Sequence, residues 1–267
     1  MNEQQGFGAL PSPPDIRDYQ LASGAVDLST LPETFINTKT KIKSQGNKQT
    51  CVAHALSSLV EFHDSLHETF STDFIYGCRT DSDYLGEGMY LRDGLKVLQH
   101  YGDVLLEDLP GNTDVPTARQ KVSQNFSSLK EKAFPNRIST YYKVNTVDEL
   151  KHSLYFNGPV PGSIRWFSGA KIDKQGNYLY TPSKEFTGHA ILIVGWTKDS
   201  FICQNSWGTW SGDKGYFYIP FEKLSEVFFE IYAVTDNITD IKKPAEAINF
   251  FSPLINLLLQ LIRKVFR

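Results

Sequence analysis

The sequence changes character after Pro159, and this change limits the folds that the chain can adopt. Before Pro159, apolar residues recur mainly at helical spacing. After it, β-branched and aromatic runs are separated by Gly, Asp, Lys and Ser, as in HAILIVGW, SFICQNSW and GYFYIP. This order predicts an α+β protein with a helical N-terminal lobe and a largely antiparallel β-sheet or barrel in the C-terminal lobe. Ligand sites are favoured in the cleft between two such lobes.

The part before Pro159 contains clear signals for the starts and ends of helices. An apolar stripe runs from Thr50 to His67 and predicts a helix with Cys51 in its first turn. A second helix is predicted over residues 91–100, with Gly102 as its terminator. Thr146 and Glu149 have the spacing of a capping box, which predicts the start of a third helix.

Composition excludes several classes of protein. The 267 residues are 40% hydrophobic and 21% charged, and the net charge of −3 gives no basic surface for nucleic acid. Three cysteines cannot all pair with one another, and the N-terminus lacks the pattern of a signal peptide. We therefore expect an intracellular, reducing environment. No run approaches the roughly 18 apolar residues of a membrane-spanning helix.

Cys51 raises the first question of chemistry. Most free cysteines simply pack in a core. A cysteine at a helix N-terminus, however, gains thiolate character from the unpaired backbone N–H groups. Gln45, in the polar loop just before it, can donate a side-chain N–H into the same space. A solvent-exposed loop glutamine is the plainer alternative.

Three later residues have the properties that a thiol nucleophile needs in its partners. His189 opens the strand HAILIVGW and is a candidate base, although a histidine at a strand end is more often structural. Asn205 follows a predicted strand, and its amide oxygen can orient the imidazole without adding a charge. Trp207 can cover that hydrogen bond and exclude water.

The segments QGNKQTC, GHAILIVGW and NSWGTWSGDKGYFYIP together resemble the papain family of cysteine peptidases, over about residues 31–233. The resemblance implies an endopeptidase that forms an acyl-enzyme on Cys51, with His189 as base and acid. It also implies that Asn205 orients the imidazole, that Gln45 serves the oxyanion hole and that Trp207 shields the site. No cofactor and no metal are implied, and the implied partner is a polypeptide substrate.

The chain departs from the family pattern around the nucleophile. Lys48 stands where the family has one half of a disulfide, and Gln49 replaces a glycine near the substrate cleft. Cys78 matches another paired position of the family, but no partner for it follows in the helical half. These departures agree with a reduced protein. They leave the specificity of the cleft open.

The resemblance also implies where a substrate binds. Family members hold the substrate backbone against a glycine of the helical lobe, for which Gly88 is the first candidate and Gly86 the rival. Ala190 and Ser163 match positions that line the pocket for the second residue before the scissile bond. Their small size predicts room for an apolar side chain.

Composition, periodicity and the resemblance together predict three parts of the chain. These are an extended leader over 1–30, a peptidase domain over 31–240 and a C-terminal helix over 241–267. Within the domain, the helical lobe covers about 40–140 and the β lobe about 141–240. The leader is too short to form the family's full inhibitory propeptide. Either the enzyme is made active or the leader lies in the cleft as a plug.

Two segments that contain several histidine or acidic residues are interpreted as exposed surface and not as metal sites. His63 and His67 have the spacing of zinc ligands, but Asp64 is shorter than the usual glutamate and no third ligand follows. Asp81, Asp83 and Glu87 lack the spacing of a calcium loop.

The C-terminal residues SPLINLLLQLIRKVFR predict an amphipathic, cationic helix, with Ser252 as cap and Pro253 in its first turn. Residues 252–267 are thus candidates for docking on this chain or on a second copy. A membrane interface and a partner groove are the alternatives.

Two rival functions remain at this point. One is a Cys-His acyl transferase or amidase of another class. The other is a non-catalytic, papain-like scaffold that acts through its C-terminal helix.

Overall fold

The computed structural model describes residues 5–15, 30–37, 40–64, 68–79 and 86–235. The chain divides into two compact units, residues 1–236 and residues 237–267. The predicted C-terminal helix belongs to the second unit and lies outside the described residues, as do His67, Asp81 and Asp83. None of the helices within the described ranges is long and apolar enough to span a membrane.

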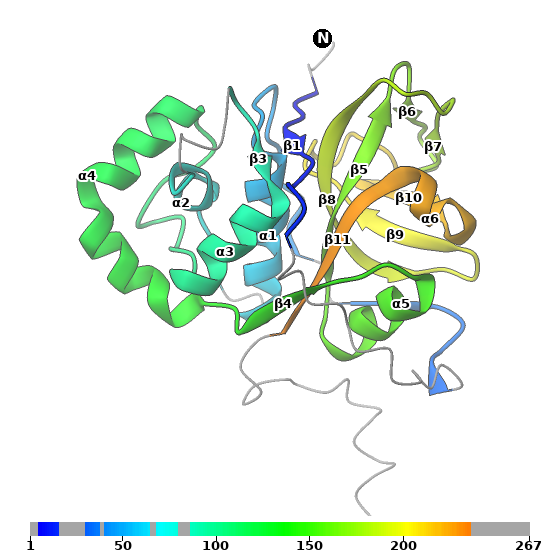
Figure 1. Ribbon diagram of the computed structural model, residues 1–267, viewed down its shortest axis with the longest axis horizontal. Coiled ribbons are helices and arrows are strands. Elements are labelled where there is room, and N and C mark those ends of the chain that lie inside the picture. Colours follow the sequence, from blue (N-terminus) through cyan, green and yellow to red (C-terminus); the bar gives the residue numbers. More distant parts are fainter. Residues whose placement is uncertain (1–4, 16–29, 38–39, 65–67, 80–85, 236–267) are drawn as a thin grey trace, which may run out of the picture. The chain divides into compact units, whose positions relative to one another are not determined.

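Four helices lie together on one side of Figure 1 and form the helical lobe. They are α1 (Cys51–His63), α2 (Thr72–Gly77), α3 (Leu91–His100) and α4 (Val115–Ala133). Two further helices, α5 (Val147–Phe156) and α6 (Leu224–Val227), accompany the sheet. A short 3₁₀ turn follows α4 at Phe134–Asn136, and another precedes α6 at Phe221–Lys223. The helix-rich half is thus confirmed.

A seven-stranded sheet forms the sheet lobe, with its main strands in the order β10-β9-β8-β5-β11-β4. The strands are β4 (Thr140–Lys143), β5 (Val160–Phe167), β8 (Phe186–Trp196), β9 (Ser200–Gln204), β10 (Tyr216–Pro220) and β11 (Phe228–Thr235). Every pair along this path is antiparallel, and β2 (Phe35–Ile36) also pairs with β8. The α+β prediction is confirmed.

Two small sheets complete the set. The strands β6 (Lys171–Ile172) and β7 (Tyr178–Leu179) form an antiparallel pair. The strands β1 (Ala9–Leu10) and β3 (Met89–Tyr90) pair in parallel, although about eighty residues separate them in the chain.

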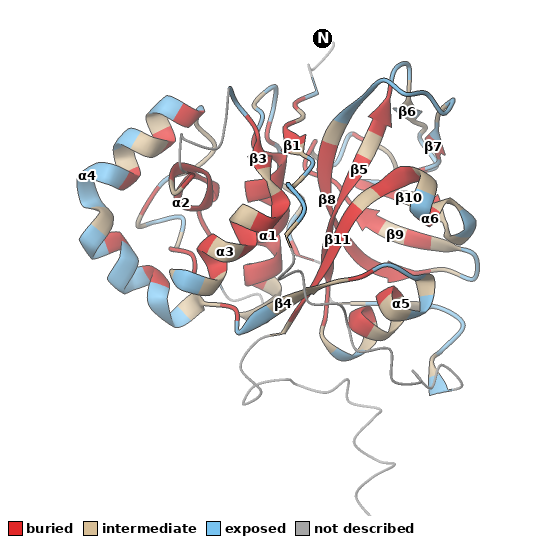
Figure 2. Ribbon diagram, viewed as in Figure 1, coloured by how far each residue is buried: buried red, intermediate tan, exposed pale blue. Residues whose placement is uncertain are grey.

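Strand β8 separates two hydrophobic cores, and both it and α1 are buried over most of their length (Figure 2). Ala190, Leu192 and Val194 pack into the core of the helical lobe. Ile191 and Ile193 point the other way, into an aromatic-rich core of the sheet lobe. This alternation, which follows from the two-residue period of a strand, places His189 at the junction of the two lobes.

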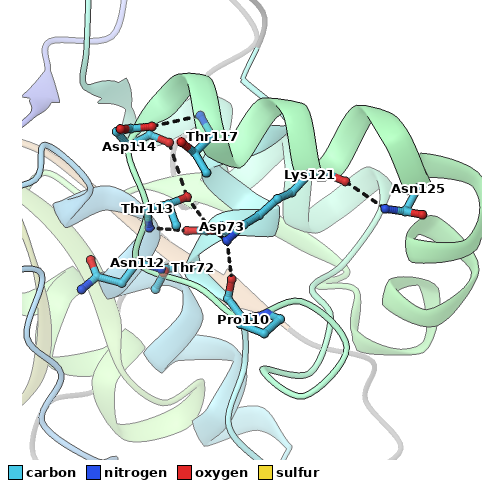
Figure 3. Close-up of polar contacts among 9 residues, drawn as sticks. All are labelled: Thr72, Asp73, Pro110, Asn112, Thr113, Asp114, Thr117, Lys121 and Asn125. Carbon is cyan, nitrogen blue, oxygen red and sulfur yellow. Dashed lines mark hydrogen bonds and ion pairs between the residues drawn. The ribbon is translucent and has the colours of Figure 1, made fainter.

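A polar network braces the loop that precedes α4 (Figure 3). The buried carboxylate of Asp73 accepts from the amide and hydroxyl of Thr113 and from Lys121 Nζ. Asp114 accepts from the Thr117 amide and caps α4. The same loop reaches Ser44, whose carbonyl accepts from Asn112 Nδ2 at 3.1 Å. The network therefore ties the loop before Cys51 to the helical lobe.

The element boundaries agree closely with the sequence predictions. The helix over 91–100 has the predicted bounds, and the capping box of Thr146 and Glu149 forms as expected. The helix that carries Cys51 begins at Cys51 but ends at His63, short of the predicted His67. Its end differs because the chain turns at Asp64, where the cap amide closes the last helical turn.

Candidate active site

Cys51 is the first residue of α1 and is fully buried. Its sulfur lies at the N-terminus of the helix, where the free backbone amides of Cys51 and Val52 act to lower the pKa of the thiol. The amide of Ala190 donates to the same sulfur. Because Ala190 directly follows His189, this contact brings the helix of Cys51 to the strand of His189.

The His189 ring is oriented by Asn205. Its Nε2 lies 2.8 Å from Asn205 Oδ1, and this oxygen also accepts from the Ser206 amide at 2.8 Å. An amide oxygen only accepts, so the imidazole donates from Nε2. A neutral ring then carries its lone pair on Nδ1, which is buried and has no hydrogen-bond partner. That nitrogen is the atom available to take a proton from a thiol.

Burial works against charge on both groups. It raises the pKa of the Cys51 thiol to about 12, although four backbone amides lower it in part. Burial also lowers the pKa of His189 to about 4, against the opposing effect of the Asn205 hydrogen bond. With both groups buried, the thiol and the imidazole are therefore neutral, whereas attack on a carbonyl requires a thiolate.

Gln45 lies in the same site, fixed by its neighbours. Its Oε1 accepts from Ser206 Oγ at 2.6 Å, and its backbone amide donates to the Ser206 carbonyl at 2.8 Å. Its Nε2 donates to the Lys48 carbonyl at 2.7 Å. The residue after Asn205 thus positions Gln45, and one amide proton on Nε2 remains for another acceptor.

Trp207 stacks on the imidazole, with ring centroids 4.5 Å apart and an interplanar angle of 25°. Sequence reasoning missed its neighbour Trp166, whose ring centroid lies 4.8 Å from that of Trp207 and 6.1 Å from that of His189. Trp166 is two residues beyond Ile164, the partner of His189 in the sheet, so the two rings lie on one face. The alternation of residues within SIRWF indicates that Trp166 lies on this face, but only once the pairing of β5 with β8 is known.

Ser163 and Ala190 lie in a row that continues to Glu230. Ser163 pairs with Ala190 on β8 and with Glu230 on β11, and Ser163 Oγ donates to Glu230 Oε1 at 3.1 Å. Glu230 is buried, and desolvation raises the pKa of its carboxyl. The two small residues that were predicted to leave room for an apolar side chain thus lie next to a carboxyl group. No local sequence pattern indicated this neighbour.

Gly88 lies beside Gly8, and its own backbone groups are occupied within the helical lobe. Its amide donates to Tyr76 Oη at 3.0 Å, and its carbonyl accepts from Arg79. The rival glycine, Gly86, is exposed and has open space beside it. A strand edge is instead offered by Met89 and Tyr90 of β3, which in this structure pair with Ala9 and Leu10 of β1.

Residues 6–13 of the chain lie across these groups, between the helices and β8 in Figure 1. Gly6 donates to the Gly46 carbonyl at 2.9 Å, and its own carbonyl accepts from Trp207 Nε1 at 3.0 Å. Gly8 donates to the Gly188 carbonyl and accepts from the Met89 amide. The Ala9 amide donates to the sulfur of Cys51. The segment therefore touches both lobes.

The same segment is packed too closely to admit larger residues. A Cβ on Gly188 would lie 1.8 Å from the Ala9 carbonyl oxygen, and a Cβ on Gly8 would lie 2.4 Å from the Gln49 carbonyl oxygen. Beyond Ala9, Ser12 approaches Glu230, and the Pro13 carbonyl accepts from Arg92. Arg92 also forms an ion pair with Asp15 at 3.4 Å.

All three cysteines are described, and none forms a disulfide. Within the described ranges, no three His, Cys, Asp or Glu side chains are grouped as metal ligands.

Comparison with known proteins places this geometry in context. A family model described as "Papain family cysteine protease" matches residues 31–235. A cathepsin B-like cysteine proteinase of Caenorhabditis elegans is 24% identical over 77% of this chain and 66% of its own length. An uncharacterised peptidase C1-like protein of Acanthamoeba polyphaga mimivirus is 27% identical over 88% of this chain and 89% of its own.

Solved structures share the fold. Xylellain, a cysteine protease from Xylella fastidiosa, superposes with a TM-score of 0.72 at 24% identity, covering 88% of this chain and 97% of its own. Procathepsin B S9 of Trypanosoma congolense gives a TM-score of 0.65 at 19% identity, covering 87% of each chain. The chain spans about a third to two thirds of the length of the matched nematode and Schistosoma mansoni relatives.

Proposed function

This chain belongs to the papain family of cysteine proteases, and we propose that it is an endopeptidase that cleaves polypeptides through a thioester on Cys51. One observation carries the proposal: the His189 Nε2 to Asn205 Oδ1 hydrogen bond of 2.8 Å leaves a buried Nδ1 for the proton of a sulfur held at the α1 N-terminus. This arrangement is a base with its orienting partner next to a nucleophile.

The reaction follows from these positions. His189 takes the thiol proton, and the Cys51 sulfur attacks the carbonyl carbon of the scissile peptide. The oxyanion receives hydrogen bonds from the Cys51 amide and Gln45 Nε2. The C–N bond then breaks, with His189 returning its proton to the leaving amine. Water, deprotonated by the same imidazole, hydrolyses the thioester and restores the thiol.

The other residues have supporting roles. Trp207 covers the His189–Asn205 hydrogen bond, and Ser206 holds both Asn205 and Gln45 in place. Ala190, Ser163 and Gly88 remain our candidates for contact with the substrate, joined by Met89 as a donor to its backbone. Three unpaired cysteines favour a reducing environment for this chemistry. Residues 252–267 remain predicted to dock on protein or membrane.

Active-site labelling tests the proposal directly. The full chain is treated with an irreversible epoxide inhibitor of thiol proteases, the adduct is mapped, and cleavage of a fluorescently labelled denatured protein is followed. We expect the adduct on Cys51 and a loss of cleavage of roughly 10⁴-fold or more in Cys51→Ala and His189→Ala. Cys78→Ala, a partly buried cysteine outside the site, is the matched control. An adduct elsewhere, or cleavage that survives in Cys51→Ala, would contradict the mechanism.

A further inference from the structure

We propose that Asn112 is a positioning residue of the peptidase reaction, because it holds the peptide unit between Ser44 and Gln45 and so aims Gln45 Nε2 at the oxyanion. This inference rests on the proposed function, since it gives Asn112 a part in the oxyanion hole of that same enzyme. The Asn112 side chain contacts the backbone just before Gln45, so it acts through that residue.

The peptide unit between Ser44 and Gln45 is held at both ends, by different lobes. Its N–H donates to the Ser206 carbonyl at 2.8 Å, and its carbonyl accepts from Asn112 Nδ2 at 3.1 Å. Ser206 lies on the sheet side of the site, whereas Asn112 lies in the loop before α4 of the helical lobe. A carbonyl that accepts a hydrogen bond polarises the N–H of its own peptide unit and strengthens the bond that this N–H donates. Loss of the Asn112 contact therefore loosens both ends.

The pairing of Ser44 shows why the sheet lobe cannot supply the second contact. Ser44 forms an isolated antiparallel bridge with Trp207, and the hydrogen bonds of this bridge are made by the residues on either side of Ser44. In such a non-hydrogen-bonded pair, the N–H and carbonyl of the paired residue itself point to the opposite edge. Asn112 Nδ2 meets the Ser44 carbonyl at that edge.

The backbone of Asn112 is fixed in a conformation that few residues adopt. Its φ is 70°, in the left-handed region that is tolerated mainly by glycine, asparagine and aspartate. Its amide donates to Thr72 Oγ1 at 3.0 Å, and a Cβ on Gly111 would lie 2.8 Å from the same hydroxyl. An uncommon conformation of this kind persists where the surrounding structure fixes it. The start of α2 thus holds the turn from which the Asn112 side chain reaches Ser44.

A buried carboxylate anchors the other end of this turn (Figure 3). Asp73 Oδ1 accepts from the Thr113 amide at 2.8 Å, and Oδ2 accepts from the Thr113 hydroxyl at 2.6 Å and from Lys121 Nζ at 2.9 Å. Lys121 Nζ also donates to the Pro110 carbonyl at 3.0 Å. Hydrogen bonds to charged groups are the stronger ones in proteins. Asn112 therefore lies between two anchored residues, and its side chain extends from a rigid base.

The position of this peptide unit matters because Gln45 has a single N–H left for the oxyanion. Its Oε1 accepts from Ser206 Oγ, and one proton of its Nε2 goes to the Lys48 carbonyl. The direction of the remaining N–H is thus set by these two bonds and by the backbone from which the side chain leaves. Oxyanion donors act only when they are placed where the charge develops, and a small displacement lowers the rate. The contribution of Asn112 is therefore expected in kcat and not in KM.

Two variants remove the donor and keep the turn. Asn112→Gly and Asn112→Asp both tolerate a positive φ, and neither can donate to the Ser44 carbonyl. In each we expect kcat for cleavage of the fluorescently labelled denatured protein to fall about 10-fold, with KM nearly unchanged. Asn125→Gly and Asn125→Asp make the same changes at an exposed asparagine of α4 and are expected to keep the wild-type kcat. A wild-type kcat in both Asn112 variants, or a loss confined to KM, would overturn the inference.

A double-mutant cycle with Gln45 separates positioning from a general effect on folding. In the Gln45→Ala background, the side chain that Asn112 positions is gone, so Asn112→Gly is expected to lower kcat by less than about twofold. A general loss of structure would instead lower kcat equally in both backgrounds. A further loss of about 10-fold in the Gln45→Ala background would show that Asn112 acts by another route and would overturn the inference.

Amide hydrogen exchange tests the physical step without depending on peptidase activity. In Asn112→Gly we expect the Gln45 amide to exchange about 10-fold faster than in wild type, because its peptide unit opens more often. The Asn205 amide, which donates to the Gly215 carbonyl at 2.9 Å on the sheet side, is expected to exchange at the wild-type rate. Unchanged exchange at Gln45, or equally faster exchange at both amides, would contradict the proposed contact.

The two proposals fail in different ways. If wild type cleaves protein and carries the inhibitor adduct on Cys51, but both Asn112 variants match its kcat, the endopeptidase stands and the positioning role does not. If wild type neither cleaves protein nor carries the adduct, the peptidase function is wrong and the positioning role fails with it.

Discussion

The wall of the active site that carries Cys51 and Gln45 and the wall that carries His189 and Asn205 are built from different interactions. On the helical side, loops are held by buried charges: Lys43, in the loop before Cys51, pairs with Glu61 of α1 at 2.8 Å. On the sheet side, residues are held by the register of β5, β8 and β9 and by an aromatic core.

This difference has consequences for what each wall tolerates. Backbone pairing fixes His189 through many weak, repeated contacts, so no single side chain beneath it is decisive. The position of Gln45 depends on a few specific polar contacts, including the Ser206 hydroxyl from the opposite wall. Buried charges and polar groups are costly when one partner is removed. We therefore expect the helical wall to be the more easily broken by single polar substitutions.

The largest effect is expected in the catalytic step itself. Gln45→Ala should lower kcat by about 10²–10³-fold with little change in KM, since the oxyanion contact forms only in the transition state. Asn205→Ala should also lower kcat. In addition it should move the acidic limb of the pH profile to lower pH, because the Asn205 hydrogen bond raises the pKa of His189.

Steady-state kinetics across pH measure both changes, with Asn47→Ala, an exposed residue of the same loop, as control. A rise in KM that accounts for the whole loss in Gln45→Ala would remove Gln45 from the oxyanion hole. A pH profile that stays in place in Asn205→Ala would show that Asn205 does not act through the imidazole.

A somewhat smaller effect is expected on folding. Lys43→Met leaves the Glu61 carboxylate buried without its cation, so the free energy of unfolding should fall by about 2–4 kcal/mol. Denaturant titration measures this loss of stability. Lys198→Met provides the contrast, because its pair with Glu33 is 80% and 71% exposed and should contribute almost nothing. Equal losses in the two variants would contradict a special role for the buried pair.

The smallest effect is expected on how the free energy of unfolding depends on pH. One carboxyl group in each lobe contributes to this dependence, and the two contributions have opposite signs. Burial raises the pKa of Asp103, which follows α3, so the folded chain keeps a proton that the unfolded chain loses above about pH 4. Its contribution to stability therefore falls as pH rises. Asp103→Asn should become progressively more stable than wild type from pH 4 upward.

Asp173, in the turn between β6 and β7, behaves in the opposite way. Hydrogen bonds from the Asn177 side chain and backbone lower the pKa of its carboxyl, so its contribution is present above about pH 4 and lost as pH falls through the folded value. Asp173→Asn should therefore be less stable than wild type near neutral pH, with the deficit shrinking in acid. Unfolding free energies measured from pH 3 to 8 test both predictions. If the difference between variant and wild type changed in the same direction with pH for both variants, the predicted contrast between the two carboxyl groups would be wrong.

The sequence by itself determined the chemistry-bearing residue types and the elements that carry them. The start of α1 at Cys51, the bounds of α3 and the strands that contain His189 and precede Asn205 all follow from local patterns. Such patterns are readable because a helix repeats every 3.6 residues and a strand every two, within a window of ten residues or so. The family motifs added the roles expected of these residues.

Only the tertiary structure decided what surrounds them. Trp166 joins the site through strand pairing, and Glu230 through a row that crosses three strands. The choice between an open cleft and a plugged one was likewise left undecided by the sequence, and Phe7 and Ala9 of the described segment lie on His189 and Cys51. These contacts join residues far apart in the chain. Their energy depends on register, close approach and burial, which no local pattern encodes.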